Sequence, residues 1–260
     1  MASMPDRESI VAKMEQRMQE GRAQLEFLEL PLCPVQPGEV RAYLAPDALS
    51  EILSLAGWGF GAMALHTRNS IWLKQLEGQA LHPEVFLLEA TADGLAAPFE
   101  PDGFPRPDRV PLIEGGQLTG KLISARSAAE LGIAPNGASA SEGPESLSLA
   151  PGSIPSAQIL ERLGTGLYVS NLWYTNVSDR SAGRITGLTR FASVWVENGK
   201  VVGPIPTMRF DDTLSRMLGA ALEGLTDHAE FIPASDSYGW RSISSWRTPG
   251  ALLNSFRLVL

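Results

Sequence analysis

The chain has 260 residues, of which 44% are hydrophobic, so it is long enough to bury a sizeable core and to form one large domain with an appendage. Its 29 acidic and 21 basic residues give a net charge of −8, which argues against a protein that binds the phosphates of a nucleic acid. The single cysteine, Cys33, excludes an intrachain disulfide and a multi-cysteine metal site, and it suits a cytoplasmic protein.

The first segment predicts a long helix over residues 6–30. Its apolar side chains follow a three-to-four spacing that only Gly21 interrupts: Val11, Met14, Met18, Leu25 and Leu28. We expect this stripe to be covered by the chain's own domain or by a partner. The segment is charged and lacks the apolar core of a signal peptide, and no apolar run of the chain approaches the roughly 20 residues that span a bilayer, so we expect no membrane partner.

The next segments alternate short strands with a few helices. Prolines at positions 31, 34 and 37 predict a stiff connection, and Pro46 predicts the start of a helix that ends at Gly57. Strands are predicted at 40–44, 71–76, 85–90, 110–113 and 117–124, and further helices at 125–131 and 155–163. This pattern indicates a β-rich α+β fold, with a strongly curved sheet or partial barrel and a few peripheral helices.

The block 164–219 holds the clearest turn signal of the chain. Asn198 and Gly199 suit a two-residue type I′ turn, because both central positions need a positive φ. The turn would join two strands and place Glu197 opposite Lys200. After that hairpin, Asp211 or Asp212 is predicted to cap a helix with one apolar face: Leu214, Met217, Leu218 and Ala221.

Two strands of this block, 166–176 and 189–197, are predicted to lie side by side. Strict alternation would put Leu167, Val169, Asn171 and Trp173 on one face and Tyr168, Ser170, Leu172 and Tyr174 on the other. Both faces mix apolar and polar groups, as expected if one covers a core and the other lines a groove. A strand edge beside a groove can hold a peptide by strand addition.

The candidate binding residues all come from these strands and the turn between them. They are Asn171, Trp173, Tyr174, Asp179, Arg184 and Arg190. Arginine offers a planar fork of donors that suits a peptide's carboxylate or backbone, whereas the same charges also suit an ordinary ion-pair network at a turn. The aromatic residues likewise suit either a groove or a core.

Several separated motifs give the chain a resemblance to a known family. NLWYTN, DRSAGRITGLTRFASVWVENG and PTMRFDDTLSRMLG, with VPLIEGGQLTGKLIS upstream and TPGALLNSFRLVL at the end, resemble the C-terminal domain of the TldD/PmbA family of peptidase-related proteins, once described as modulators of DNA gyrase. The resemblance covers residues from about Arg41 onward, and its form is similar to the PmbA branch. It implies the same β-rich fold.

Catalytic members of that family bind zinc through an H-E-x-x-x-H helix of the preceding domain and a late cysteine. This chain has neither feature, and its three histidines (His66, His82, His228) form no i, i+4 pair. Ser235, Asp236 and Ser237 stand where the cysteine is expected. The resemblance therefore implies a subunit or domain with no catalytic residue, metal or cofactor of its own, although His228, Asp236 and another histidine could still converge as a zinc site.

Three functions follow as hypotheses. The chain is a non-metal-binding component of a peptidase system that binds a peptide or a partner, an autonomous zinc metallopeptidase with unfamiliar ligands, or a non-catalytic dimerisation domain. Because full-length members carry another domain before this region, residues 1–30 are interpreted as the remnant of a linker and 31–260 as the C-terminal domain. The expected partner is a second copy or a TldD-like subunit.

Overall fold

The structure is a computed structural model that describes residues 7–235 and 243–259. In this part of the chain, strands outnumber helices and join one mixed sheet that does not close into a barrel, which confirms the predicted α+β class. The strands are β1 (Gly38–Leu44), β2 (Leu87–Glu89), β3 (Val110–Glu114), β4 (Gln117–Leu118), β5 (Ser146–Leu149), β6 (Gly166–Val169), β7 (Asn171–Asp179), β8 (Arg184–Arg190), β9 (Val194–Glu197), β10 (Lys200–Pro204), β11 (Arg209–Thr213), β12 (Leu222–Pro233) and β13 (Ser245–Val259).

The helices are mostly short and peripheral. They are α1 (Arg7–Leu28), α2 (Pro46–Gly57), α3 (Ala62–His66), α4 (Leu73–Leu76), α5 (Ala125–Leu131) and α6 (Ile159–Leu163), with single turns η1 (Trp58–Phe60), η2 (Thr91–Asp93), η3 (Ser156–Gln158) and the π-helical η4 (Arg216–Ala220). Within residues 7–235 and 243–259, none of the helices is both long and apolar enough to cross a membrane.

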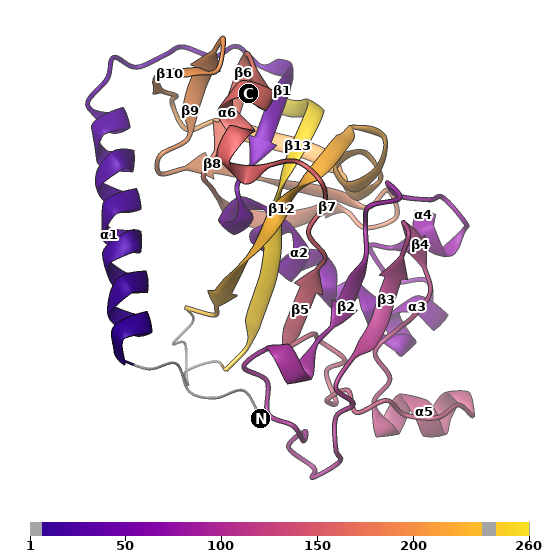
Figure 1. Ribbon diagram of the computed structural model, residues 1–260. Helices are drawn as coiled ribbons and strands as arrows, with labels where there is room; N and C mark the ends of the chain where they lie inside the picture. The colour runs from indigo at the N-terminus through magenta and orange to yellow at the C-terminus, as the bar shows by residue number, and fades with distance from the viewer. Residues whose placement is uncertain (1–6, 236–242, 260) are drawn as a thin grey trace.

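The long strand β13 organises the sheet. One of its edges pairs with β5 and then with β1, and the other pairs with β12 and then with β11. Figure 1 shows β13 in yellow at the middle of the molecule, with α1 set apart beside the β9 and β10 strands. Each section of β13 therefore has strand neighbours that come from distant parts of the sequence.

The helix α2 and the segment after it cover the core side of the sheet. Leu49, Ile52 and Leu53 are buried in the main hydrophobic cluster, as the apolar face of the predicted helix requires. Trp72 stacks on Phe60 with ring centroids 4.8 Å apart, and its indole nitrogen donates to the carbonyl of Ala56 at 2.9 Å. These contacts join the end of α2 to the segment that follows it.

The predicted strand at 71–76 is wrong. The Ser70 hydroxyl donates to the carbonyl of Gly59 and accepts from the Trp72 amide, so the chain turns there, and Leu73–Leu76 continues as the helix α4. The predicted strand at 117–124 is too long, since β4 ends at Leu118. Beyond it the Thr119 and Gly120 amides both donate to the Leu112 carbonyl of β3, and the Leu122 amide then donates to the Phe60 carbonyl.

The prediction that Asp211 or Asp212 caps a helix is wrong. Both lie in β11, which pairs with β8. Asp212 is buried, and its carboxylate accepts from the amides of Thr213 and Arg257 and from the Arg216 guanidinium. The apolar residues that follow are buried as expected, but they belong to a π-helical turn, η4.

The predicted pairing of 166–176 with 189–197 is confirmed, but the predicted faces are wrong. Gly166 lies opposite Val196, and Asn171 lies opposite Arg190. A break at Ser170, whose hydroxyl donates to the Arg190 carbonyl, divides the segment into β6 and β7. Because the break shifts the alternation, Val169 and Leu172 are both buried.

Candidate functional site

The predicted binding residues lead to a groove of about 620 Å³ between α2, β7 and the paired ends of β12 and β13. It is lined by Asp47, Ser50, Glu51 and Ser54 of α2, Asn171–Thr175 of β7, and Phe191, Ile232, Pro233, Ser235 and Trp246. We call it the β7 groove. Its volume falls in the range of ligand-binding clefts.

The wall from α2 is polar because this helix is amphipathic. Asp47, Ser50, Glu51 and Ser54 follow the i, i+3, i+4, i+7 spacing and so share one face. The opposite face of α2 enters the core. The packing of α2 on the sheet therefore presents these side chains to the groove.

The wall from β7 is a strand with one open edge. Within the described residues β7 pairs with β8 alone, so its second edge has no strand neighbour. The pairing shifts between Trp173 and Asn176, and Tyr174 in this bulge has a φ of 48°. Bulges of this kind redirect side chains and end regular pairing.

Three aromatic side chains are exposed at this bulge. The exposed fractions are 41% for Trp173, 75% for Tyr174 and 62% for Phe191. The Trp173 and Tyr174 rings meet edge to face with centroids 5.7 Å apart, and the Arg190 guanidinium carbon lies 4.8 Å from the Trp173 ring and 5.4 Å from that of Phe191. Such an aromatic group with a guanidinium on it is typical of recognition surfaces.

The groove continues toward α1. A second hollow of about 680 Å³ shares Asp47, Asn171 and Phe191 with it and is bounded by α1 residues that include Arg17, Leu25 and Leu28. Burial, and then the negative charge of Glu230, raise the pKa of Asp47, and the charge of Arg17 partly offsets them. The junction of the two hollows is therefore acidic and partly desolvated.

The structure brings together four of the six predicted site residues. Asn171, Trp173 and Tyr174 line the β7 groove, and Arg190 stacks on the Trp173 ring. The other two, Asp179 and Arg184, lie opposite each other at the far end of the β7–β8 hairpin.

There they have local partners. Asp179 accepts from the Ser181 hydroxyl at 2.7 Å and from the Ala182 amide at 3.1 Å, and these bonds lower its pKa. Arg184 lies 3.3 Å from Asp211. These contacts match the ion-pair and turn interpretation that the sequence left open for both residues.

Sequence reasoning missed Asp47, Glu51 and Phe191. The spacing of polar residues on the predicted helix Pro46–Gly57 could have drawn attention to the first two. Nothing in the sequence pattern indicates that this helix lies across from β7, because that contact depends on the pairing of β13 with β1 and β12.

The three histidines, which the sequence analysis considered as zinc ligands, lie in separate parts of the fold. His66 ends α3, His82 accepts from the Glu84 amide, and His228 lies in β12. Among residues 7–235 and 243–259, no three His, Cys, Asp or Glu side chains are close enough to hold a metal ion. Asp236 and Ser237 lie outside the described residues.

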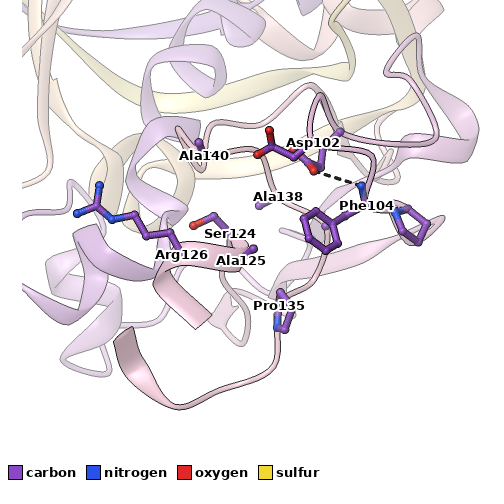
Figure 2. Close-up of a pocket in the computed structure, with 11 residues that line it drawn as sticks. Asp102, Phe104, Ser124, Ala125, Arg126, Pro135, Ala138 and Ala140 are labelled. Carbon is purple, nitrogen blue, oxygen red and sulfur yellow. Dashed lines mark hydrogen bonds between the residues drawn. The ribbon is translucent and has the colours of Figure 1, made fainter. Parts of the chain in front are cut away.

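A smaller cavity of about 280 Å³ lies between the loop before β3 and the ends of α5. Figure 2 shows Phe104, Ala125 and Ala138 around it, with the guanidinium of Arg126 directed away. The buried Glu100 carboxylate accepts from the Phe104 amide at 3.2 Å, which holds the loop. This cavity shares no lining residue with the β7 groove.

Comparison with known proteins identifies relatives of the whole fold. The family model for the PmbA/TldA metallopeptidase C-terminal domain matches residues 37–259. The structure of TldE from Thermococcus kodakarensis is similar with a TM-score of 0.80 and 15% identity, over 95% of this chain and 55% of that one. No curated protein matches the chain.

Two proteins described as modulators of DNA gyrase are also similar. For the one from Thermotoga maritima the TM-score is 0.72 and the identity 16%, over 88% of this chain and 51% of that chain. For the one from Bacteroides thetaiotaomicron the values are 0.70 and 20%, over 94% and 51%. The chain thus spans about half the length of these three relatives, and at such identities the likeness shows the fold alone.

Proposed function

Because the chain belongs to the family of PmbA/TldA metallopeptidase C-terminal domains, we propose that it is the peptide-binding component of a peptidase system and holds an extended peptide in the β7 groove. On this proposal it binds no zinc of its own, and a partner subunit carries out hydrolysis. Supporting this division, Ser235, Asp236 and Ser237 stand in the region where the catalytic members carry their late cysteine.

The open edge of β7 is the observation that supports peptide binding. Its backbone donors and acceptors on that edge have no strand neighbour in the described residues, and the groove beside them has a volume of about 620 Å³. Strand addition would satisfy these groups while alternate side chains of the peptide contact Trp173 and Tyr174. Main-chain pairing would supply affinity for many sequences.

A second subunit is part of the same proposal. It is either another copy of this chain or a TldD-like protein, by analogy with the relative named TldE. We further propose that residues 1–30 are the linking helix and 31–260 the binding domain. A cytoplasmic location completes the proposal and is supported by the single cysteine.

The experiment is to titrate the protein into a fluorescently labelled, unstructured peptide. Trp173→Ala should weaken binding by about tenfold or more, as the loss of an aromatic anchor typically does. Trp58→Ala is the matched control, because Trp58 is also exposed, at 59%, and lies outside the groove. Equal losses in both variants, or an unchanged affinity in Trp173→Ala, would contradict the proposal.

A further inference from the structure

The β7 groove carries a feature that strand addition does not require, an acidic residue set against aromatic rings. Asp47 lines both hollows at their junction, where Phe191 also lies. Trp173 and Tyr174 line the β7 groove. Main-chain pairing would work equally well beside neutral side chains. The acidic residue and the aromatic rings would therefore contact a side chain of the ligand.

Asp47 lacks a partner in the described part of the chain. No donor within residues 7–235 and 243–259 hydrogen bonds to its carboxylate, and no cation lies within 4.0 Å of it. The cation whose charge reaches it is Arg17, and the Arg17 guanidinium is already held by Glu230 at 2.6 Å and by Glu20 at 3.4 Å. A second carboxylate, that of Glu51, lines the same wall one turn along α2.

The aromatic wall already binds a cation. Arg190 places its guanidinium 4.8 Å from the Trp173 centroid and 5.4 Å from the Phe191 centroid. The Tyr174 ring is the most exposed of the three, and no guanidinium from the described residues lies over it. A ring face beside a carboxylate attracts ammonium and guanidinium groups, because both the quadrupole and the charge favour them.

Asp47 also has a structural explanation, since it lies in the first turn of α2, where a negative charge complements the helix dipole. A carboxylate fully exposed to water would interact with the helix dipole equally well. The dipole does not account for a carboxylate placed in a groove beside Glu230 and facing an aromatic wall.

We propose that the β7 groove selects extended peptides that carry a lysine or arginine side chain, which lies between Asp47 and the exposed Tyr174 ring, while Arg190 stays on the Trp173 and Phe191 rings. This inference rests on the proposed function and names its substrate class. The net charge of −8 favours the same peptides at long range.

The test uses three unstructured peptides that differ at one central position, as lysine, glutamine or glutamate. The lysine peptide should bind about five- to tenfold more tightly than the glutamine peptide, and the glutamate peptide most weakly. Added salt should reduce this preference. In Asp47→Asn the lysine-to-glutamine ratio should fall toward one, and in Asp47→Lys the preference should move to the glutamate peptide.

The matched control is Asp108→Asn, which removes one exposed negative charge outside the groove and should keep the ratio of the unaltered protein. Equal binding of all three peptides would overturn the selectivity and leave peptide binding itself intact. Equal loss of the ratio in Asp108→Asn would assign the preference to net charge and overturn the role of Asp47. Failure of all three peptides to bind would overturn both proposals.

Discussion

Tyr174 and Phe191 hold backbone conformations that aromatic residues seldom adopt. Their φ angles are 48° and 56°, in the left-handed region, where a side chain costs roughly 1–2 kcal/mol relative to glycine. Both rings are exposed, so burial does not repay this cost. Strain kept at a surface is typical of residues that contact a ligand.

Replacing Tyr174 by glycine and by alanine separates the effect of backbone strain on stability from the effect of losing the ring, because both variants lack the ring. Glycine usually makes a folded chain less stable than alanine by about 0.5–1 kcal/mol. At Tyr174 we expect the reverse order, with Tyr174→Gly more stable than Tyr174→Ala by about 1 kcal/mol, because only alanine keeps the strain. Urea denaturation of both variants measures the difference.

Trp173 is the control for this comparison, since its φ is not positive. There Trp173→Gly should be the less stable variant. If Tyr174 showed the ordinary order as well, the backbone at the bulge would relax without cost, and the strain would carry no functional meaning.

Residue patterns predicted part of this site. The polar residues Asn171, Thr175 and Asn176, interleaved with aromatic ones, indicated a groove strand, and residues 171–175 line the β7 groove. The acids of PTMRFDD were misinterpreted as a helix cap because local sequence cannot show that β11 joins β8 and buries Asp212. Tertiary pairing overrides a capping signal of about 1 kcal/mol.

Elements with strong local signals were predicted well. The Asn198-Gly199 turn has φ angles of 50° and 75° and sets Glu197 opposite Lys200, as the dipeptide indicates. The segment 71–76 lacked such a signal. Its apolar residues suit a strand or a buried helix equally, and Ser70 and Trp72 decide the outcome through contacts with residues 56–59.

The helix α1 forms as predicted, but its own domain leaves the apolar stripe uncovered. The exposed side chains are Val11, Met14, Met18, Leu25 and Leu28. Phe27 packs on a core cluster, and Arg17 binds Glu230. Full burial of each such side chain is worth about 1.5–3 kcal/mol. We therefore expect the stripe to be covered by a second copy or a partner.

Sedimentation at increasing concentration tests this expectation. The unaltered protein should associate, and a Met14→Glu, Met18→Glu variant should stay monomeric. Ala23→Glu, on the opposite side of the helix, should behave like the unaltered protein. A monomer at every concentration, with unprotected α1 amides in hydrogen exchange, would contradict association of this chain with itself, and mixing with a TldD-like subunit would then test the other partner.

Stability of the whole molecule should depend on Glu89. This side chain is buried under the β2–β5 part of the sheet and accepts from the Glu145 and Ser146 amides, while its second oxygen has no hydrogen-bond partner in the described residues. Burial, its largest influence, raises the pKa of Glu89 from an ordinary 4.5 to about 7.

The folded state therefore keeps the Glu89 proton over a pH range in which the unfolded state has lost it. Between about pH 4.5 and pH 7 the free energy of unfolding should fall as pH rises, by about 3 kcal/mol at most. Urea denaturation across this range should show the slope, and Glu89→Gln should flatten it. Glu39 gives the opposite slope only at lower pH, since hydrogen bonds from Ser255 and Arg257 lower its pKa to about 2. An unchanged slope in Glu89→Gln would assign the pH dependence to other groups.

The central position of β13 has a consequence for how the molecule is made. Each strand that β13 pairs with, β1, β5, β11 and β12, precedes it in the sequence. The ribosome therefore synthesises β1 more than 200 residues before β13. Until β13 is made, the edges of β1, β5, β11 and β12 that pair with it stay unpaired. Such long-range pairing is slow and exposes strand edges to aggregation. Folding of this sheet is thus expected to finish only after residues 245–259 emerge, and holding chaperones should bind the nascent chain until then.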